Sequence, residues 1–129
     1  MADYTPVYSG GVQPQSHTTS AVVTGGQVLE VTATGTVGPA AAGTAKPVGV
    51  AAHDAASGAR VNVWPLTNVI HEITVVAAAT VTAGDGVITG TAGTVNTATV
   101  GTAAAAGTLI GTALTTATAG NKVRFIGRG

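Results

Sequence analysis

Three side chains that could take part in hydrolytic chemistry lie close together in the chain: His53, Asp54 and Ser57. A catalytic triad combines a hydroxyl nucleophile, a histidine base and an acid that orients the histidine. Here the histidine and the acid are adjacent, and adjacent residues of a strand point to opposite faces. The surrounding residues also lack a nucleophile elbow and an oxyanion loop. We therefore interpret this stretch as the loop of a hairpin and predict no catalytic residues and no enzymatic activity.

The remaining polar groups do not form a metal or phosphate site. His71 and Glu72 lie in a strand-like run without the second histidine of a zinc-binding helix, and His17 is distant in the sequence. Asp85 stands between two glycines as a turn residue, whereas a calcium loop needs several acidic ligands close together. No glycine is followed by the Lys-Ser/Thr pair of a phosphate loop. We predict no metal and no cofactor.

The composition narrows the class of protein further. The 129 residues indicate one domain, and 8% of them are charged, against about 25% in ordinary domains. Five basic and five acidic residues leave no basic patch, so we predict no nucleic-acid partner. The absence of cysteine excludes disulfides and thiol chemistry. The beginning of the chain does not resemble a signal peptide and no stretch suits a membrane span, so we expect a soluble protein without a membrane partner.

From Ala21 onward, short runs rich in Val, Ile and Thr are broken by glycines at intervals of about 8 to 12 residues. This spacing predicts an all-β fold, a small β-sandwich or β-barrel, as a single domain over residues 21–129. Three short alanine runs, at 40–42, 77–79 and 103–106, are too short to predict a helix. The strands are expected at 21–23, 27–33, 46–52, 60–66, 69–76, 86–89, 108–114 and 122–126.

Blocks of the first half recur in the second half in the same order, over about 24–64 and 82–126. For example, T-G-G-Q at 24–27 resembles T-A-G-D at 82–85, and S-G-A-R-V-N-V at 57–63 resembles A-G-N-K-V-R-F at 119–125. The offset grows from 58 to 62 residues, so the second copy carries an insertion near 96–106. The repeat predicts two similar β-units linked by the segment 69–76.

The repeat also bears on the polar stretch described first. His53 and Asp54 fall where the second copy has Thr115 and Thr116. Because two threonines stand at the equivalent positions, we interpret His53 and Asp54 as part of a hairpin loop that both copies share.

Residues 1–20 differ from the rest of the chain and predict an extended N-terminal arm. The arm holds two of the four aromatic residues although it has little periodic pattern, which favours ordering on the surface of a partner. The core-forming residues are mostly Ala and Val, and such a thin core favours oligomerisation. The candidate interface residues are Tyr4, Pro6, Val7, Tyr8 and Trp64; for Trp64 a core or sheet-edge position is the simpler interpretation.

Four segments carry a resemblance to a known family: Y-T-P-V-Y-S-G-G in the arm, T-G-G-Q-V-L-E-V at 24–31, K-P-V-G-V-A-A-H-D-A-A-S-G-A-R-V-N-V at 46–63 and T-A-G-D-G-V at 82–87. The closing I-G-T-A-L-T-T-A-T-A-G-N-K-V-R-F-I also fits. With these segments the chain resembles the small capsid decoration, or cement, proteins of tailed bacteriophages, especially phages of actinobacteria.

The resemblance implies a structural, non-enzymatic role in the virion. Proteins of this family bind the outer surface of the expanded capsid and bridge neighbouring subunits of the major capsid protein. They often do so as trimers at threefold and quasi-threefold positions. The expected partners are therefore the phage major capsid protein and further copies of this chain, with synthesis in the cytoplasm of the host bacterium.

Two other functions remain open at this stage. One is a carbohydrate-binding or adhesin-like β-module displayed on a virion or cell surface, although Trp64 and the two tyrosines are the few aromatic side chains such a site could use. The other is a hydrolase that uses the polar residues at 53, 54 and 57. A screen against glycans separates the first from a capsid protein, and replacing His53 by threonine tests the second.

Overall fold

The computed structural model describes residues 3–128, and its secondary structure is almost entirely β. This confirms the predicted all-β fold. A single short α-helix and one turn of 3-10 helix interrupt the strands within that range. The elements are β1 (Gln15–Thr19), β2 (Val28–Ala33), β3 (Thr36–Pro39), β4 (Pro47–Ala51), β5 (Arg60–Pro65), β6 (Ile70–Thr74), β7 (Thr80–Val81), β8 (Gly86–Thr89), η1 (Thr91–Gly93), β9 (Val95–Ala98), α1 (Val100–Ala106), β10 (Gly111–Ala113), β11 (Ala117–Thr118) and β12 (Lys122–Gly127).

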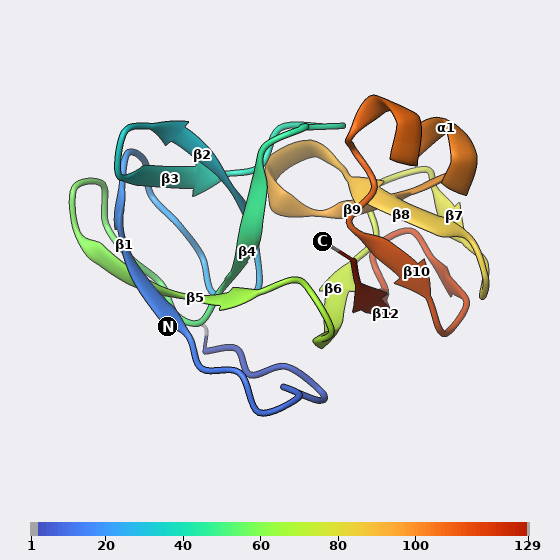
Figure 1. The fold of residues 1–129 in the computed structure, drawn as a ribbon, viewed down its shortest axis with the longest axis horizontal. Coiled ribbons are helices and arrows are strands. Elements are labelled where there is room, and N and C mark those ends of the chain that lie inside the picture. The colour runs from blue at the N-terminus through green and yellow to red at the C-terminus, as the bar shows by residue number, and fades with distance from the viewer. Residues whose placement is uncertain (1–2, 129) are drawn as a thin grey trace.

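The strands form two units of the same topology that lie side by side along the molecule (Figure 1). In the first unit, β1-β3-β2-β4-β5 close into a barrel. In the second, the sheet order β6-β12-β10-β8-β9 is the same cyclic order, with β6 in the place of β1. The parallel bridge between Val75 and Val95 corresponds to the parallel pair of Thr19 and Val37 that closes the first barrel. The two β-units predicted from the repeat are therefore present.

A turn with the same hydrogen bonds opens the main sheet of each unit. In the first, the backbone N–H of Thr24 donates to Oε1 of Gln27 at 2.8 Å, and in the second the N–H of Thr82 donates to Oδ2 of Asp85 at 2.9 Å. The third turn residue is a glycine in both, with φ of +91° at Gly26 and +94° at Gly84. Few other residues adopt this backbone conformation, which explains why glycine occupies this position in both copies.

Each unit has its own apolar interior, built mainly from valine and alanine. Alternate residues of each strand point inward, so the two interiors are lined by equivalent positions. The first unit's cluster consists of Val23, Leu29, Val37, Ala51, Val61 and Val63, and their counterparts in the second are Val81, Val87, Val95, Ala113, Val123 and Phe125. The larger Phe125 is fully buried and enlarges the second cluster.

The outer face of the first unit contributes to the core of the second. Four first-unit residues, Val28, Ala40, Val50 and Leu66, belong to the second unit's buried cluster and are at most 7% exposed. Gly93, in η1, lies against this face and donates its N–H to the carbonyl of Ala40 at 3.0 Å. The two units therefore share one buried cluster.

Several details differ from the sequence-based expectations. Residues 15–19, which were assigned to the arm, form β1 of the first barrel, so the segment that precedes the barrel ends at Pro14. The segment 69–76 is more than a link, because it supplies β6. The expected strand at 21–23 is reduced to a single bridge at Val23. The strands β3 and β9 were not expected at all.

The prediction that the alanine run at 103–106 is not helical is wrong. These residues form most of α1, which ends at Gly107 in a left-handed conformation, with φ of +74°. A helix this short is marginal on its own. Packing of the buried Ala103 against the rest of the second unit supplies the stabilisation that local propensity lacks. The helix lies where the repeat placed its insertion.

Candidate interaction surface

The polar stretch at 53–57 forms the hairpin loop expected from the repeat. Nε2 of His53 accepts a hydrogen bond from the N–H of Asn62 at 3.2 Å, as Oγ1 of Thr115 does from Arg124 at 3.0 Å. The other ring nitrogen, Nδ1, lies 2.9 Å from the carbonyl oxygen of Asp54 and donates to it. Both nitrogens of His53 are therefore used to hold the loop in shape.

Asp54 has an equivalent structural role. Its Oδ1 accepts from the N–H of Gly25 at 2.9 Å, and Oγ1 of Thr116 accepts from Ala83 at 3.0 Å in the second unit. Ser57 is exposed, and both ring nitrogens of His53 are bonded to backbone groups of other residues. The geometry assigns loop-stabilising roles to the histidine and the aspartate and brings no nucleophile to them.

An open hollow lies beside the second copy of the opening turn. It has a volume of about 550 Å³ and is lined by Gly84, Asp85, Gly86 and residues 97–100. The carboxylate of Asp85 accepts hydrogen bonds from the N–H of Thr82 and the hydroxyl of Thr97, and these bonds lower its pKa. The carboxylate is thus ionised and already hydrogen-bonded, which suits a structural turn rather than proton transfer.

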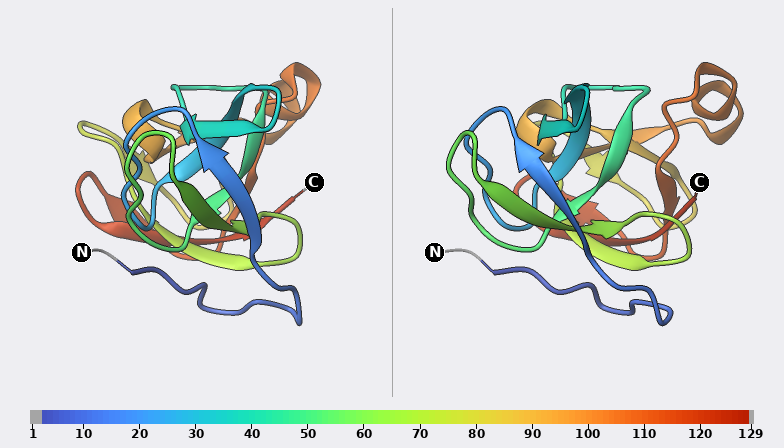
Figure 2. Two further views of the ribbon diagram at one scale, coloured as in Figure 1. Left: turned by 90° about the vertical axis from the view of Figure 1, so that its left-hand side faces the viewer. Right: turned by 60° about the vertical axis from the view of Figure 1, so that its left-hand side comes forward.

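Residues 3–8 lie against both units of their own chain (Figure 2). The N–H of Tyr4 donates to the carbonyl of Ala52 in the first unit at 2.8 Å. Further along, the N–H of Val7 donates to the carbonyl of Ile70, and the N–H of Ile70 donates to the carbonyl of Tyr8, both at 2.9 Å. The arm therefore adds a short antiparallel contact to the edge of β6.

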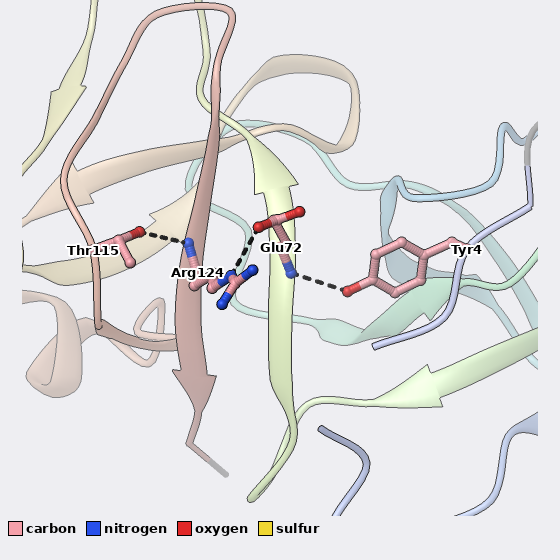
Figure 3. A network of polar contacts seen from close by, with 4 residues as sticks. All are labelled: Tyr4, Glu72, Thr115 and Arg124. Carbon is pink, nitrogen blue, oxygen red and sulfur yellow. Dashed lines mark hydrogen bonds and ion pairs between the residues drawn. The ribbon is translucent and has the colours of Figure 1, made fainter. Parts of the chain in front are cut away.

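The side chain of Tyr4 connects the arm to β6 through hydrogen bonds. Its hydroxyl oxygen accepts from the N–H of Glu72 at 3.1 Å (Figure 3) and lies 2.8 Å from Nδ1 of His71. Nε2 of His71 is 2.8 Å from the carbonyl oxygen of Pro65, to which it must donate, because a carbonyl can only accept. Nδ1 of the neutral ring then accepts a hydrogen bond from the hydroxyl of Tyr4.

Burial keeps both members of this pair uncharged near neutral pH. His71 is fully buried, with its ring 5.8 Å from those of Tyr4 and Phe125. Burial lowers the pKa of His71 to about 4, although the hydrogen bond to Pro65 opposes the shift. Burial likewise raises the pKa of Tyr4 above its ordinary value. The contact is therefore a neutral, directional hydrogen bond inside the protein.

Tyr8 and the strands beside it form an exposed row. Tyr8 is the antiparallel partner of Ile70, Ile70 is opposite Ile126, and Ile126 is opposite Thr112. Directly opposed residues lie on the same face of a sheet. The neighbouring row, which includes Phe125, points into the core, so this one points outward. Tyr8 is 60% exposed and Ile126 36%, and we call the three residues Tyr8, Ile70 and Ile126 the outer row.

The structure divides the five predicted interface residues into two groups. Tyr4 and Pro6 turn into their own chain, where Pro6 is buried. Val7 and Tyr8 remain exposed, at 46% and 60%. Trp64 is partly buried on β5. Its indole Nε1 is buried and has no hydrogen-bond partner within the described part of the chain.

Sequence reasoning missed the contribution of the C-terminal strands to this surface. Ile126 lies in the outer row, and Leu114, which is 47% exposed, donates its N–H to the carbonyl of Arg124 in the same strand as Ile126. A signal was present, because the repeat aligns Ile126 with Trp64. The repeat alone does not show which of these two equivalent residues is buried and which is exposed.

Residues 3–128 contain no group of three or more His, Cys, Asp or Glu side chains arranged to hold a metal ion. None of the helices described there is long and apolar enough to cross a membrane.

Comparison with known proteins finds similarity among solved structures. No family model matches the chain, and no curated protein matches it. Among solved structures, the chain is similar to the N base of head fiber gp8.5 of bacteriophage phi29. The TM-score is 0.65 at 24% sequence identity, and the match covers 88% of this chain and 92% of that one. The likeness therefore extends over nearly the whole two-unit fold.

Proposed function

We propose that the chain is a structural protein of a bacteriophage virion, located on the head. The observation that carries the proposal is the fold shared with the base of a phage head fiber over 88% of this chain. The sequence resemblance to capsid decoration proteins points to the same kind of particle by a separate route. The small number of charged residues suits a surface that packs against other proteins in a repeating lattice.

In finer detail, we infer that the chain is a cement protein on the outer surface of the expanded capsid. It would bridge major capsid protein subunits, as a trimer at threefold and quasi-threefold positions. The outer row supports a protein partner, because Tyr8 and Ile126 expose apolar surface next to the ion pair of Arg124 and Glu72. Aromatic and apolar side chains with a polar rim are typical of protein interfaces. Many copies on one shell make modest individual contacts sufficient.

A non-enzymatic role fits the side chains at 53–57. His53 and Asp54 hold backbone N–H groups of Asn62 and Gly25, which threonines do in the other unit. Their polar atoms serve the shape of the loop. Carbohydrate binding is an alternative outcome of the experiments below, and the exposed Tyr8 is the residue that such binding would use.

The proposed surface is tested with three variants that each place serine at an exposed apolar position. Tyr8→Ser and Ile126→Ser alter the outer row, and Val31→Ser, at a residue 43% exposed on β2, is the matched control. We expect the first two to weaken binding to expanded heads about tenfold or more, as removal of an interface anchor does, and the control to bind normally. Equal binding by all three variants would remove the outer row from the interface. Binding to glycans that depends on Tyr8 would favour the adhesin-like alternative.

A further inference from the structure

The face of the first unit that packs against the second unit has an equivalent face on the second unit. Val28 and Val50 are opposite each other on the outer face of the first barrel, and both are fully buried against the second unit. The equivalent pair in the second unit is Gly86 and Thr112, which are also opposite each other. The same face thus exists twice, and within residues 3–128 no further β-unit covers the second copy.

The side chains of the second face are less apolar than those of the first. The four buried residues of the first face are Val28, Ala40, Val50 and Leu66, and their counterparts are Gly86, Ala98, Thr112 and Arg128. One of the four positions is alanine in both units. At two of the others the valine is replaced by glycine or threonine, which removes apolar surface, and at the last the leucine is replaced by a charged arginine. A face that stacks onto another unit requires apolar side chains, whereas a terminal face must tolerate water.

The helix α1 covers what remains of this face. A Cβ atom at Gly86 would lie 3.2 Å from Cγ2 of Val100, the first residue of α1, and 3.0 Å from Cδ1 of Leu109. These two side chains therefore occupy the space that the Val28 side chain fills in the first unit. At the other end of α1, Gly107 and Arg128 line one small hollow. Figure 1 shows α1 at the end of the molecule away from the first unit.

The helix is also the part of the chain that the first unit lacks. Between the equivalent residues Ala98 and Leu109 there are four more residues than between Ala40 and Pro47. The packing of α1 is light, since Ala103 is its buried residue and an open, mainly apolar hollow of about 200 Å³ lies beside Ile88. A loosely packed helix of small residues covers the face without requiring large apolar partners.

We propose that α1 is a terminal cap. It takes the place on the second unit that the second unit takes on the first, and it prevents the chain from associating with further copies through this face. In the first unit, β1 pairs with β3 and closes the barrel, so this unit has no open strand edge to which another copy could add. Association of the protein with itself or with a shell is thereby left to other surfaces. This inference does not depend on the proposed role in the virion.

The test removes the cap and restores an apolar face. In the main variant, residues 99–108 are replaced by the first-unit connection 41–46, and Thr112→Val and Arg128→Leu are added. The control variant carries Thr112→Val and Arg128→Leu with α1 intact. Light scattering coupled to size-exclusion chromatography is run over a range of concentrations. We expect the mass of the main variant to rise about twofold or more over that of the wild type, while the control keeps the wild-type mass.

A second variant tests the proposal in case the main variant does not fold. Ala103→Asp, combined with Thr112→Val and Arg128→Leu, places a charge at the buried position of α1 and displaces the helix without shortening the chain. Faster amide exchange at residues 100–106 verifies that the cap has opened. Self-association of this variant supports the proposal even if the main variant is unfolded. An open helix, or a folded main variant, with the wild-type mass at all concentrations overturns it.

Discussion

The hydroxyl of Tyr4 lies 2.8 Å from Nδ1 of His71, and this contact joins the N-terminal arm to the second unit of the fold. The two residues are 67 positions apart in the sequence. The tyrosine oxygen also accepts from the N–H of Glu72, so one side chain satisfies two polar groups of β6. The arm is therefore part of the folded protein, and its exposed residues are presented from a fixed position.

Replacing Tyr4 by phenylalanine tests the strength of this contact. The change leaves Nδ1 of His71 and the N–H of Glu72 without the tyrosine oxygen, so we expect the free energy of unfolding to fall by about 1–3 kcal/mol. Urea denaturation measures the loss, and limited proteolysis reports release of the arm. Tyr8→Phe is the matched control, since Tyr8 is 60% exposed. A Tyr4→Phe variant as stable as the control would show that the hydrogen bonds do not hold the arm.

Acidification should weaken the fold through His71. Its pKa is lowered from 6.5 to about 4 in the folded protein, so the unfolded chain takes up a proton first as the pH falls. The contribution of His71 to the free energy of unfolding is therefore fully present above pH 6.5 and declines as the pH falls from 6.5 to 4. At the lower end of this range the loss is on the order of 3 kcal/mol. Unfolding by urea at a series of pH values measures this dependence. In His71→Gln the decline between pH 6.5 and 5 should be smaller, and an unchanged decline would assign it to other groups.

The loop at 53–57 offers a test of structural against catalytic roles. Exchanging His53 and Asp54 for threonines, as in the second unit, keeps an oxygen acceptor for the N–H groups of Asn62 and Gly25. We expect the His53→Thr/Asp54→Thr variant to stay within about 1 kcal/mol of the wild type in thermal unfolding. His53→Ala/Asp54→Ala, which lacks the acceptors, should lose about 1–3 kcal/mol. Equal losses in both variants would contradict the equivalence of the two loops.

A glycine at the same position in each unit allows two neighbouring strands to approach closely. A Cβ atom at Gly111 would collide with the backbone carbonyl of Ile126, as one at Gly49 would with that of Trp64. We expect Gly111→Ala to destabilise the protein by about 3 kcal/mol or more, because the obstacle is backbone. Gly101→Ala is the control: Gly101 lies in α1 with nothing near its missing Cβ, so this change should stabilise by about 0.5–1 kcal/mol. Denaturation midpoints of the two variants should therefore move in opposite directions.

The repeat made much of this fold predictable from the sequence. It placed the insertion that became α1, and it assigned His53 and Asp54 to the same hairpin positions as Thr115 and Thr116, which their hydrogen bonds match. Strands such as β3, T-V-G-P, were missed because glycine and proline interrupt the β-branched pattern. Helix α1 was missed because its stability comes from packing rather than from its seven residues alone.

The candidate surface was harder to predict. Aromatic residues in the arm pointed to contacts, but the sequence could not show that Tyr4 turns inward to His71 while Tyr8 stays exposed. That difference depends on a contact across 67 residues. Nor could the sequence show that Ile126 is exposed whereas the equivalent Trp64 is partly buried, because this depends on how the two units pack. Removing residues 1–20 would also delete β1, so the arm is better tested by single substitutions than by that truncation.

The central claim, that the chain binds a phage head, is tested most directly by co-sedimentation. The purified protein is mixed with expanded heads and, separately, with unexpanded procapsids of the phage that encodes it, both stripped of the chain. The account predicts saturable binding to expanded heads alone, with a copy number per shell that reveals whether three chains occupy each threefold site. Absence of binding to either particle would contradict the capsid role.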